Sequence, residues 1–311
     1  MLLDKNLVKA VEDDHVDWFV KLAAKKCSWA KKTTREKYLS KILNFSPSKS
    51  FKDSIRPYLV GDRAKMCSLK RKLKTKTGKQ ATKLLEAFGY KEFTEKRKKR
   101  WGAFKFCEKI KVNVCPYCNR QYTFTVKNIG NDYVARPEID HFFPKNIYPY
   151  LSCNLYNFIP SCHTCNNIKS SKVRNILYPY EDDFDALGDF KLSYNNNDLT
   201  GKKIGTFDVV ANRGNIIVKL VSNDKKFKNA ASLFHLEDLY NMHEIELYDF
   251  LERYKNYQDP KLKEIKSLLK NKHLDQNKLK KYILGFPILD DDKNYPLKKF
   301  KKDIKKQLDN S

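Results

Sequence analysis

The sequence predicts an α+β protein that is mainly helical, with a small strand-and-helix module near its middle. Apolar residues recur at helical spacing through residues 1–110 and again from residue 230 onward. Polar and apolar residues alternate over 120–126, and short apolar runs at 133–139 and 157–160 are typical of strands. Two C-x-x-C pairs bracket these runs, and paired cysteines at this spacing are typical of metal sites.

We expect three regions along the chain. Residues 1–110 form a basic helical region, with Ser50 or Asp53 capping a helix after the break at 44–50. Residues 111–185 hold the central module. Residues 186–311 begin with a small β segment, in which 206–210 and 215–220 are expected to pair, and continue as lysine-rich helices.

The charge of the chain indicates a polyanionic partner. Its 311 residues carry a net charge of +26, and residues 1–110 alone hold 30 lysines and arginines against 12 acidic residues. Such proteins usually bind phosphates, because neutralising a phosphate backbone releases its counterions. The alternative is a lysine-rich proteome in which many surfaces are basic without binding anything. The dense runs 70–78 and 96–100 are open to the same two interpretations.

Cysteine usage and hydropathy indicate the compartment. No stretch approaches the roughly 20 apolar residues that a membrane helix needs, so no membrane association is expected. Disulfide scaffolds usually belong to much smaller secreted chains, which favours a reducing, cytoplasmic location.

The sequence predicts the order of the strands, loop and helix in the central module. A turn at 128–132 precedes a strand that ends at Asp140-His141, and residues 142–156 form a loop. A short strand returns at 157–160, and a helix follows at 163–172. On that helix Asn166 and Lys169 are three residues apart and therefore share a face.

Four cysteines are the expected ligands of a structural zinc ion: Cys115, Cys118, Cys162 and Cys165. Two C-x-x-C pairs supply four thiolates, which complete a tetrahedral site with no open position. The alternative is four reduced, buried cysteines.

The segment Glu138-Ile-Asp-His-Phe-Phe-Pro144, followed by Asn157-x-x-Pro160 and Cys162-x-x-Cys165-Asn166-x-x-Lys169, resembles the HNH endonucleases. The resemblance spans residues 112–172, roughly a fifth of the chain. It implies a central ββα-metal HNH module stapled by a zinc site of four cysteines.

The resemblance also implies a role for each site residue. His141 would be the general base that activates water, and Asn157 would brace the loop that carries it. Asp140 and Asn166 would hold one catalytic Mg²⁺ or Mn²⁺, although many relatives have histidine in place of Asn166. Residues expected to contact the nucleic-acid backbone surround this centre, and each is otherwise an ordinary surface charge: Arg136, Lys145, Lys169 and Lys172.

A narrower resemblance, through Asp140-His-Phe-Phe-Pro-Lys145 and Tyr148-Pro-x-Leu151, is to the PtuB-like HNH effectors of Septu and retron anti-phage systems. Those proteins more often have Glu-His where this chain has Asp-His. The resemblance implies a defence nuclease that acts on nucleic acid, with DNA favoured over RNA as the substrate. It also implies an ATPase partner that is encoded nearby. The alternatives are cleavage of RNA such as tRNA, restriction or homing activity, and a zinc-bearing nucleic-acid-binding module without catalysis.

Overall fold

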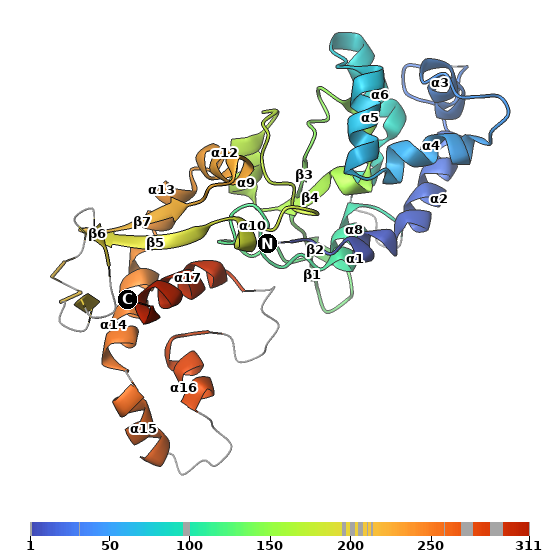
Figure 1. The fold of residues 1–311 in the computed structure, drawn as a ribbon. Coiled ribbons are helices and arrows are strands. Elements are labelled where there is room, and N and C mark those ends of the chain that lie inside the picture. Colours follow the sequence, from blue (N-terminus) through green and yellow to red (C-terminus); the bar gives the residue numbers. More distant parts are fainter. Residues whose placement is uncertain are drawn as a thin grey trace. The chain divides into compact units, whose positions relative to one another are not determined.

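The computed structural model describes residues 2–30, 32–95, 100–194, 197–199, 203–204, 208–209, 211–212, 214–257, 259–268, 276–286 and 295–310. Within them the chain is mainly helical with small antiparallel sheets, which confirms the α+β class (Figure 1). Residues 96–99 of the second basic run lie outside the described residues, as do 206, 207 and 210 of one expected strand.

Contacts divide the chain into two compact units. One holds Leu2–Tyr117 and Gln121–Asp182, and the other holds Cys118–Arg120 and Asp183–Ser311. The basic helical region and most of the central module therefore belong to the same unit. The proposed boundaries at residues 110 and 185 stay a prediction.

Helices fill the first part of the chain, as the apolar spacing predicts. They are α1 (Lys5–Lys9), α2 (Glu12–Ala23), α3 (Arg35–Ile42), α4 (Phe51–Val60), α5 (Arg63–Leu73), α6 (Gly78–Phe88), α7 (Tyr90–Thr94) and α8 (Ala103–Ile110). Ser50 caps α4, because its hydroxyl accepts a hydrogen bond from the backbone N–H of Asp53 at 3.1 Å. Gly89 ends α6 at a φ of +71°, and a Cβ there would lie 2.3 Å from a methyl carbon of Leu22.

The central module contains two antiparallel hairpins and a helix. Strands β1 (Val126–Lys127) and β2 (Tyr133–Ala135) form the first, and β3 (Glu138–His141) and β4 (Phe158–Ser161) form the second. Two short 3-10 helices, η1 (Pro149–Leu151) and η2 (Leu155–Asn157), lie in the loop between β3 and β4. Helix α9 (His163–Lys169) follows β4 and is shorter than expected, because Ser170 takes a φ of +46°.

Helices α7 and α8 pack against strand β4 through aromatic side chains. The ring of Phe158 stacks on Phe93 with centroids 5.0 Å apart, and Phe106 meets the same ring edge-on at 5.7 Å. All three side chains are fully buried. His141 is the cross-strand partner of Phe158 in the β3–β4 hairpin, so the packing of this apolar core also fixes the position of the histidine.

The second unit surrounds a three-stranded sheet in the order β6–β5–β7. Its elements are α10 (Phe184–Leu187), β5 (Asp189–Tyr194), β6 (Asn197–Asp198), β7 (Ile216–Val221), α12 (Lys225–Leu233), α13 (Leu236–Asn241), α14 (Glu244–Asn256), α15 (Asp259–Leu268), α16 (Gln276–Ile283) and α17 (Lys298–Asp309). The expected strand at 215–220 is present as β7, but it pairs with β5, a strand that the sequence analysis did not identify. None of the helices in the described residues has the length and apolar composition needed to cross a membrane.

His15 is a buried histidine that links helix α2 to the loop of the central module. Its Nε2 lies 2.7 Å from the carbonyl oxygen of Cys153, and its Nδ1 accepts a hydrogen bond from the indole N–H of Trp101 at 2.9 Å. These contacts match a neutral ring protonated on Nε2. Burial lowers the pKa of His15 to about 4, although the bond to Cys153 acts in the opposite direction.

This neutral histidine predicts a loss of stability in acid. The unfolded chain takes up a proton near pH 6.5 and the folded chain only near pH 4, so the free energy of unfolding should fall as the pH drops through this window. The expected contribution of His15 is about 3 kcal/mol. Urea denaturation of the wild type and His15→Gln at several pH values should show a weaker pH dependence in the variant. His235→Gln, at an exposed histidine, should keep the wild-type dependence, and equal slopes for all three proteins would contradict the assignment.

Candidate active site and metal centre

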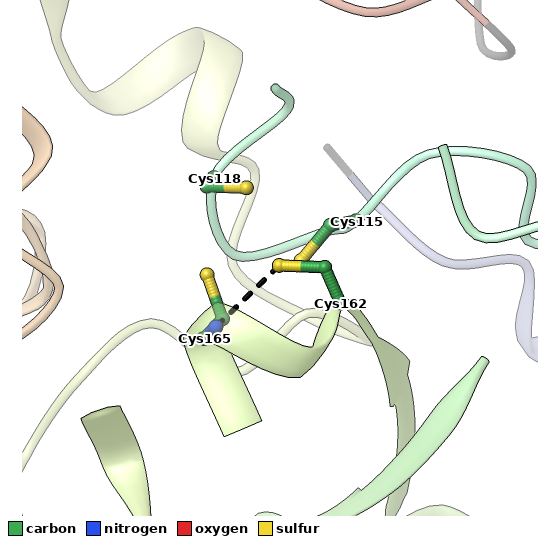
Figure 2. Close-up of side chains that lie close together, drawn as sticks. All are labelled: Cys115, Cys118, Cys162 and Cys165. Carbon is green, nitrogen blue, oxygen red and sulfur yellow. Dashed lines mark hydrogen bonds between the residues drawn. The ribbon is translucent and has the colours of Figure 1, made fainter. Parts of the chain in front are cut away.

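Four cysteines converge on a common point. The sulfur atoms of Cys115, Cys118, Cys162 and Cys165 all lie within 4.8 Å of one another, and all four residues are buried. Figure 2 shows their side chains pointing toward one another. A tetrahedral zinc ion would hold its four sulfurs at about 3.8 Å from each other, since the Zn–S bond is about 2.3 Å. The cluster can hold a metal ion such as zinc.

The second cysteine pair also begins helix α9. Cys162 is the N-cap residue, and its sulfur accepts the backbone N–H of Cys165 at 3.4 Å (Figure 2). The cysteine cluster therefore fixes the N-terminus of α9, the helix that carries Asn166 and Lys169. His163, the next residue, lies outside the cluster because its exposed ring bonds Glu138 at 2.7 Å.

Asp140 lies near the end of β3, and its carboxylate bonds two side chains. One oxygen accepts the hydroxyl of Tyr117 at 2.7 Å, and the ammonium of Lys169 lies 3.0 Å and 2.9 Å from the two oxygens. Asp140 is 3% exposed and Lys169 only 1%. A buried carboxylate needs such partners, because an uncompensated charge in the interior is costly.

His141 presents one ring nitrogen to the protein backbone. Its Nε2 lies 2.9 Å from the carbonyl oxygen of Ser152, which can only accept, so Nε2 carries the hydrogen and Nδ1 carries the lone pair. The rings of Tyr90 and Phe158 meet the imidazole edge-on, with centroids at 4.7 Å and 5.3 Å. Burial lowers the pKa of His141 to about 3, helped by the positive charge of Lys145. The ring is therefore neutral across the physiological range.

Asn157 ties together both ends of the loop that follows His141. Its side-chain oxygen accepts the backbone N–H of Phe143 at 2.7 Å. Its amide nitrogen donates to the carbonyl oxygens of Phe143 and Leu151 at 3.0 Å and 3.1 Å. The hydrogen bonds of this fully buried side chain all go to backbone atoms of the loop, so Asn157 holds the two parts of the loop together.

Asn166 reaches from α9 toward β3. Its amide nitrogen donates to a carboxylate oxygen of Glu138 at 2.5 Å, so its side-chain oxygen is turned to the other side. Burial acts to raise the pKa of Glu138, but the hydrogen bonds from His163 and Asn166 outweigh it and the pKa is lowered. Glu138 is therefore a carboxylate at neutral pH.

A pocket of about 420 Å³ brings these side chains together. It is lined by Glu138, Asp140, His141 and Asn166, with Arg136 and Lys145 among its remaining walls. Carboxylate and amide oxygens are the donors that Mg²⁺ and Mn²⁺ prefer, so the donor set fits a hard divalent cation. Arg136 stacks over the ring of Phe104 and Lys145 over the ring of Tyr90, at 5.3 Å and 5.0 Å. The pocket thus combines oxygen donors, a neutral imidazole and two cations.

Two of the expected nucleic-acid contacts, Lys169 and Lys172, do not line the pocket. Lys169 is buried, and its ammonium also donates to the carbonyl oxygen of His141 at 2.6 Å. Burial lowers the pKa of Lys169, while Asp140 acts to raise it. This placement corrects the expectation of a surface phosphate contact, because the ammonium serves as the counter-ion of Asp140. Lys172 is exposed just beyond the end of α9 and does not line the pocket.

Two tyrosines of the site were missed by sequence analysis. Tyr117 lies inside the first C-x-x-C pair, so its position beside the metal cluster was a signal that could have been used. Tyr90 comes from helix α7, about fifty residues before His141, and only the packing of α7 on β4 brings its ring there. Nothing in the local sequence identifies such a contact.

Part of the chain is similar to a curated protein. The chain is 33% identical over 102 residues to the Septu protein PtuB of Bacillus thuringiensis. The aligned part covers 32% of this chain and 36% of the relative, so the chain matches about a third of that protein's length. No family model matches the chain, and no solved structure matches it. The similarity to the Septu protein is therefore limited to about a third of each chain.

Proposed function

We propose that this chain is a metal-dependent HNH endonuclease that hydrolyses phosphodiester bonds in DNA. The observation that carries the proposal is the orientation of His141, whose lone-pair nitrogen belongs to a ring lining the same pocket as Asp140 and Asn166. A hydrolase of this kind needs a neutral base beside a hard cation and a phosphate site. The pocket offers a residue for each of these tasks.

His141 would accept the proton of the attacking water on Nδ1. The bond from Nε2 to Ser152 holds the ring in the required tautomer, and the low pKa keeps it unprotonated before the reaction. A substrate phosphate beside the ring would raise this pKa, because its negative charge favours the imidazolium. The ring would therefore be unprotonated before substrate binds, and a bound phosphate would favour proton uptake while the divalent cation would oppose it.

Asp140 and Asn166 would hold the divalent cation through their side-chain oxygens. The ion supplies positive charge that offsets the charge developing on the phosphate and on the leaving oxygen. Tyr117 and Lys169 fix the carboxylate of Asp140, and Glu138 fixes the amide of Asn166. Arg136 and Lys145 would hold the phosphate in the pocket.

His141→Ala should reduce plasmid nicking in Mg²⁺ or Mn²⁺ by about 10²- to 10⁴-fold, the usual contribution of a general base. His235→Ala, a change at an exposed histidine in the other compact unit, should cut like the wild type. Equal cutting by wild type and His141→Ala would remove this residue from the mechanism. The same proteins incubated with transfer RNA distinguish a ribonuclease, for which the RNA and not the plasmid would be cleaved.

We further propose that the cysteine cluster binds zinc as a structural ion. Metal analysis should find about one zinc per chain in the purified wild type, because four thiolates leave no open position. Cys165→Ser should lose the zinc and unfold at a much lower temperature, since binding of structural zinc is coupled to folding. Cys67→Ser, at a cysteine outside the cluster, should keep both properties. Full zinc content in Cys165→Ser would contradict the assignment.

The similarity to the Septu protein PtuB supports a role in anti-phage defence. In that role the chain would act with an ATPase partner encoded beside it. Co-expression of the tagged chain with the neighbouring ATPase should yield a complex that survives gel filtration. A chain that cuts DNA at full rate alone and does not bind the ATPase would favour an independent restriction or homing nuclease.

A further inference from the structure

A second pocket lies in the basic helical region, away from the residues assigned above. It has a volume of about 470 Å³ and lies between helix α2 and the start of helix α8. The residues that determine its chemistry are two tryptophans and four cations: Trp18, Trp101, Lys21, Lys25, Arg100 and Lys105. The candidate nuclease centre uses none of them.

The two indole rings are held in place by His15. Trp18 stacks on the imidazole, with centroids 5.4 Å apart and planes within 24° of parallel, and meets Phe93 edge-on at 5.5 Å. Trp101 is fixed by its hydrogen bond to Nδ1 of His15. Both tryptophans are half-buried and line the pocket. A planar ligand would therefore meet aromatic surfaces that are already ordered, which keeps the entropic cost of binding low.

The cations of the pocket come from two segments of the chain. Trp18 and Lys21 are three residues apart on α2 and share one side of that helix, and Lys25 follows just after the helix ends. Arg100 and Trp101 precede the extended N-cap Gly102 of α8, Lys105 lies in the first turn of that helix, and all three of these side chains line the pocket. Each of the two segments thus contributes one indole and at least one cation to the pocket.

The carboxylates of the pocket leave its positive charge in excess. Asp17 is paired with Lys52 at 2.6 Å, and Glu92 is paired with Arg35. Lys52 and Arg35 do not line the pocket, so these two acidic charges are neutralised from outside it. Asp14 adds one negative charge against the four cations. An anionic ligand is therefore favoured.

We propose that this pocket binds a nucleobase together with its phosphate. The base would stack against Trp18 and Trp101, and the phosphate would bind Lys21, Lys25, Arg100 and Lys105. A free nucleotide and a position of single-stranded nucleic acid carry the same two groups. An acidic peptide would use the cations but leave the indoles without a stacking partner, so the observations favour the nucleotide. The proposal does not depend on phosphodiester hydrolysis.

Titration of the full-length protein without added divalent metal tests the pocket. Tryptophan fluorescence should be quenched by adenosine monophosphate at lower concentration than by adenosine or by inorganic phosphate, because only the nucleotide offers both groups. A deoxythymidine decamer distinguishes the source: tighter binding of the decamer indicates single-stranded nucleic acid, and tighter binding of the monophosphate indicates a free nucleotide.

Two variants and one control connect the binding to the pocket. Lys21→Gln/Lys25→Gln changes two exposed lysines and should weaken binding of adenosine monophosphate about tenfold or more. Trp18→Leu should weaken it to a similar extent through loss of stacking. Lys37→Gln/Lys41→Gln removes two exposed lysines at the same spacing on α3 and should bind like the wild type.

The proposal is overturned if the Lys21→Gln/Lys25→Gln protein binds adenosine monophosphate like the wild type. It is also overturned if inorganic phosphate or a glutamate peptide binds as tightly as the nucleotide, since the indoles would then have no part. Because the lysine variant changes only exposed charges, the test holds even where Trp18→Leu fails to fold.

Discussion

The hydrogen bond between Nε2 of His141 and the carbonyl oxygen of Ser152 is the contact on which the proposed chemistry depends. It decides which ring nitrogen carries the lone pair, and it can do so only if the carbonyl is held still. Asn157 holds it, because its amide joins Phe143 at one end of the loop to Leu151 near the other. Replacing this buried amide would leave several backbone groups unpaired, so the loop and the tautomer would be lost together.

The basic helical region fixes the same loop from the outside. The backbone N–H of Lys76 bonds the carbonyl of Ile147, the hydroxyl of Tyr150 bonds the carbonyl of Lys74, and the amide of Asn154 bonds the carbonyl of Gly61. The ammonium of Lys70 lies 3.8 Å from the ring centre of Phe143. Helix α5 and its flanking segments are therefore part of the scaffold of the candidate site, in addition to carrying positive charge.

Buried polar groups connect the two pockets through one continuous set of contacts. Trp101 bonds His15, and His15 bonds the carbonyl of Cys153, the residue after Ser152. The carbonyl of Ser152 in turn bonds His141. Because His15, Cys153, Ser152 and His141 are buried, their polar groups cannot exchange these partners for water without a cost in free energy. The aromatic pocket and the candidate active site are thus both held by hydrogen bonds to the backbone of Ser152 and Cys153.

Several features of the protein follow from residue patterns in its amino-acid order. The helical content and the cap at Ser50 could be predicted because periodicity and capping depend on neighbouring residues. The convergence of Cys115, Cys118, Cys162 and Cys165 could be predicted because two C-x-x-C pairs are a recognised ligand pattern for one metal ion, even when they are distant in sequence. The burial of Lys169 against Asp140, the contact of Tyr90 with His141 and the pairing of β7 with β5 became evident only in the folded protein. These contacts join residues that are distant in sequence, and burial is set by everything that packs around a side chain. In the sequence, a lysine that contacts a phosphate and a lysine that is the buried counter-ion of a carboxylate look the same. Only the burial of the side chain in the folded protein distinguishes them.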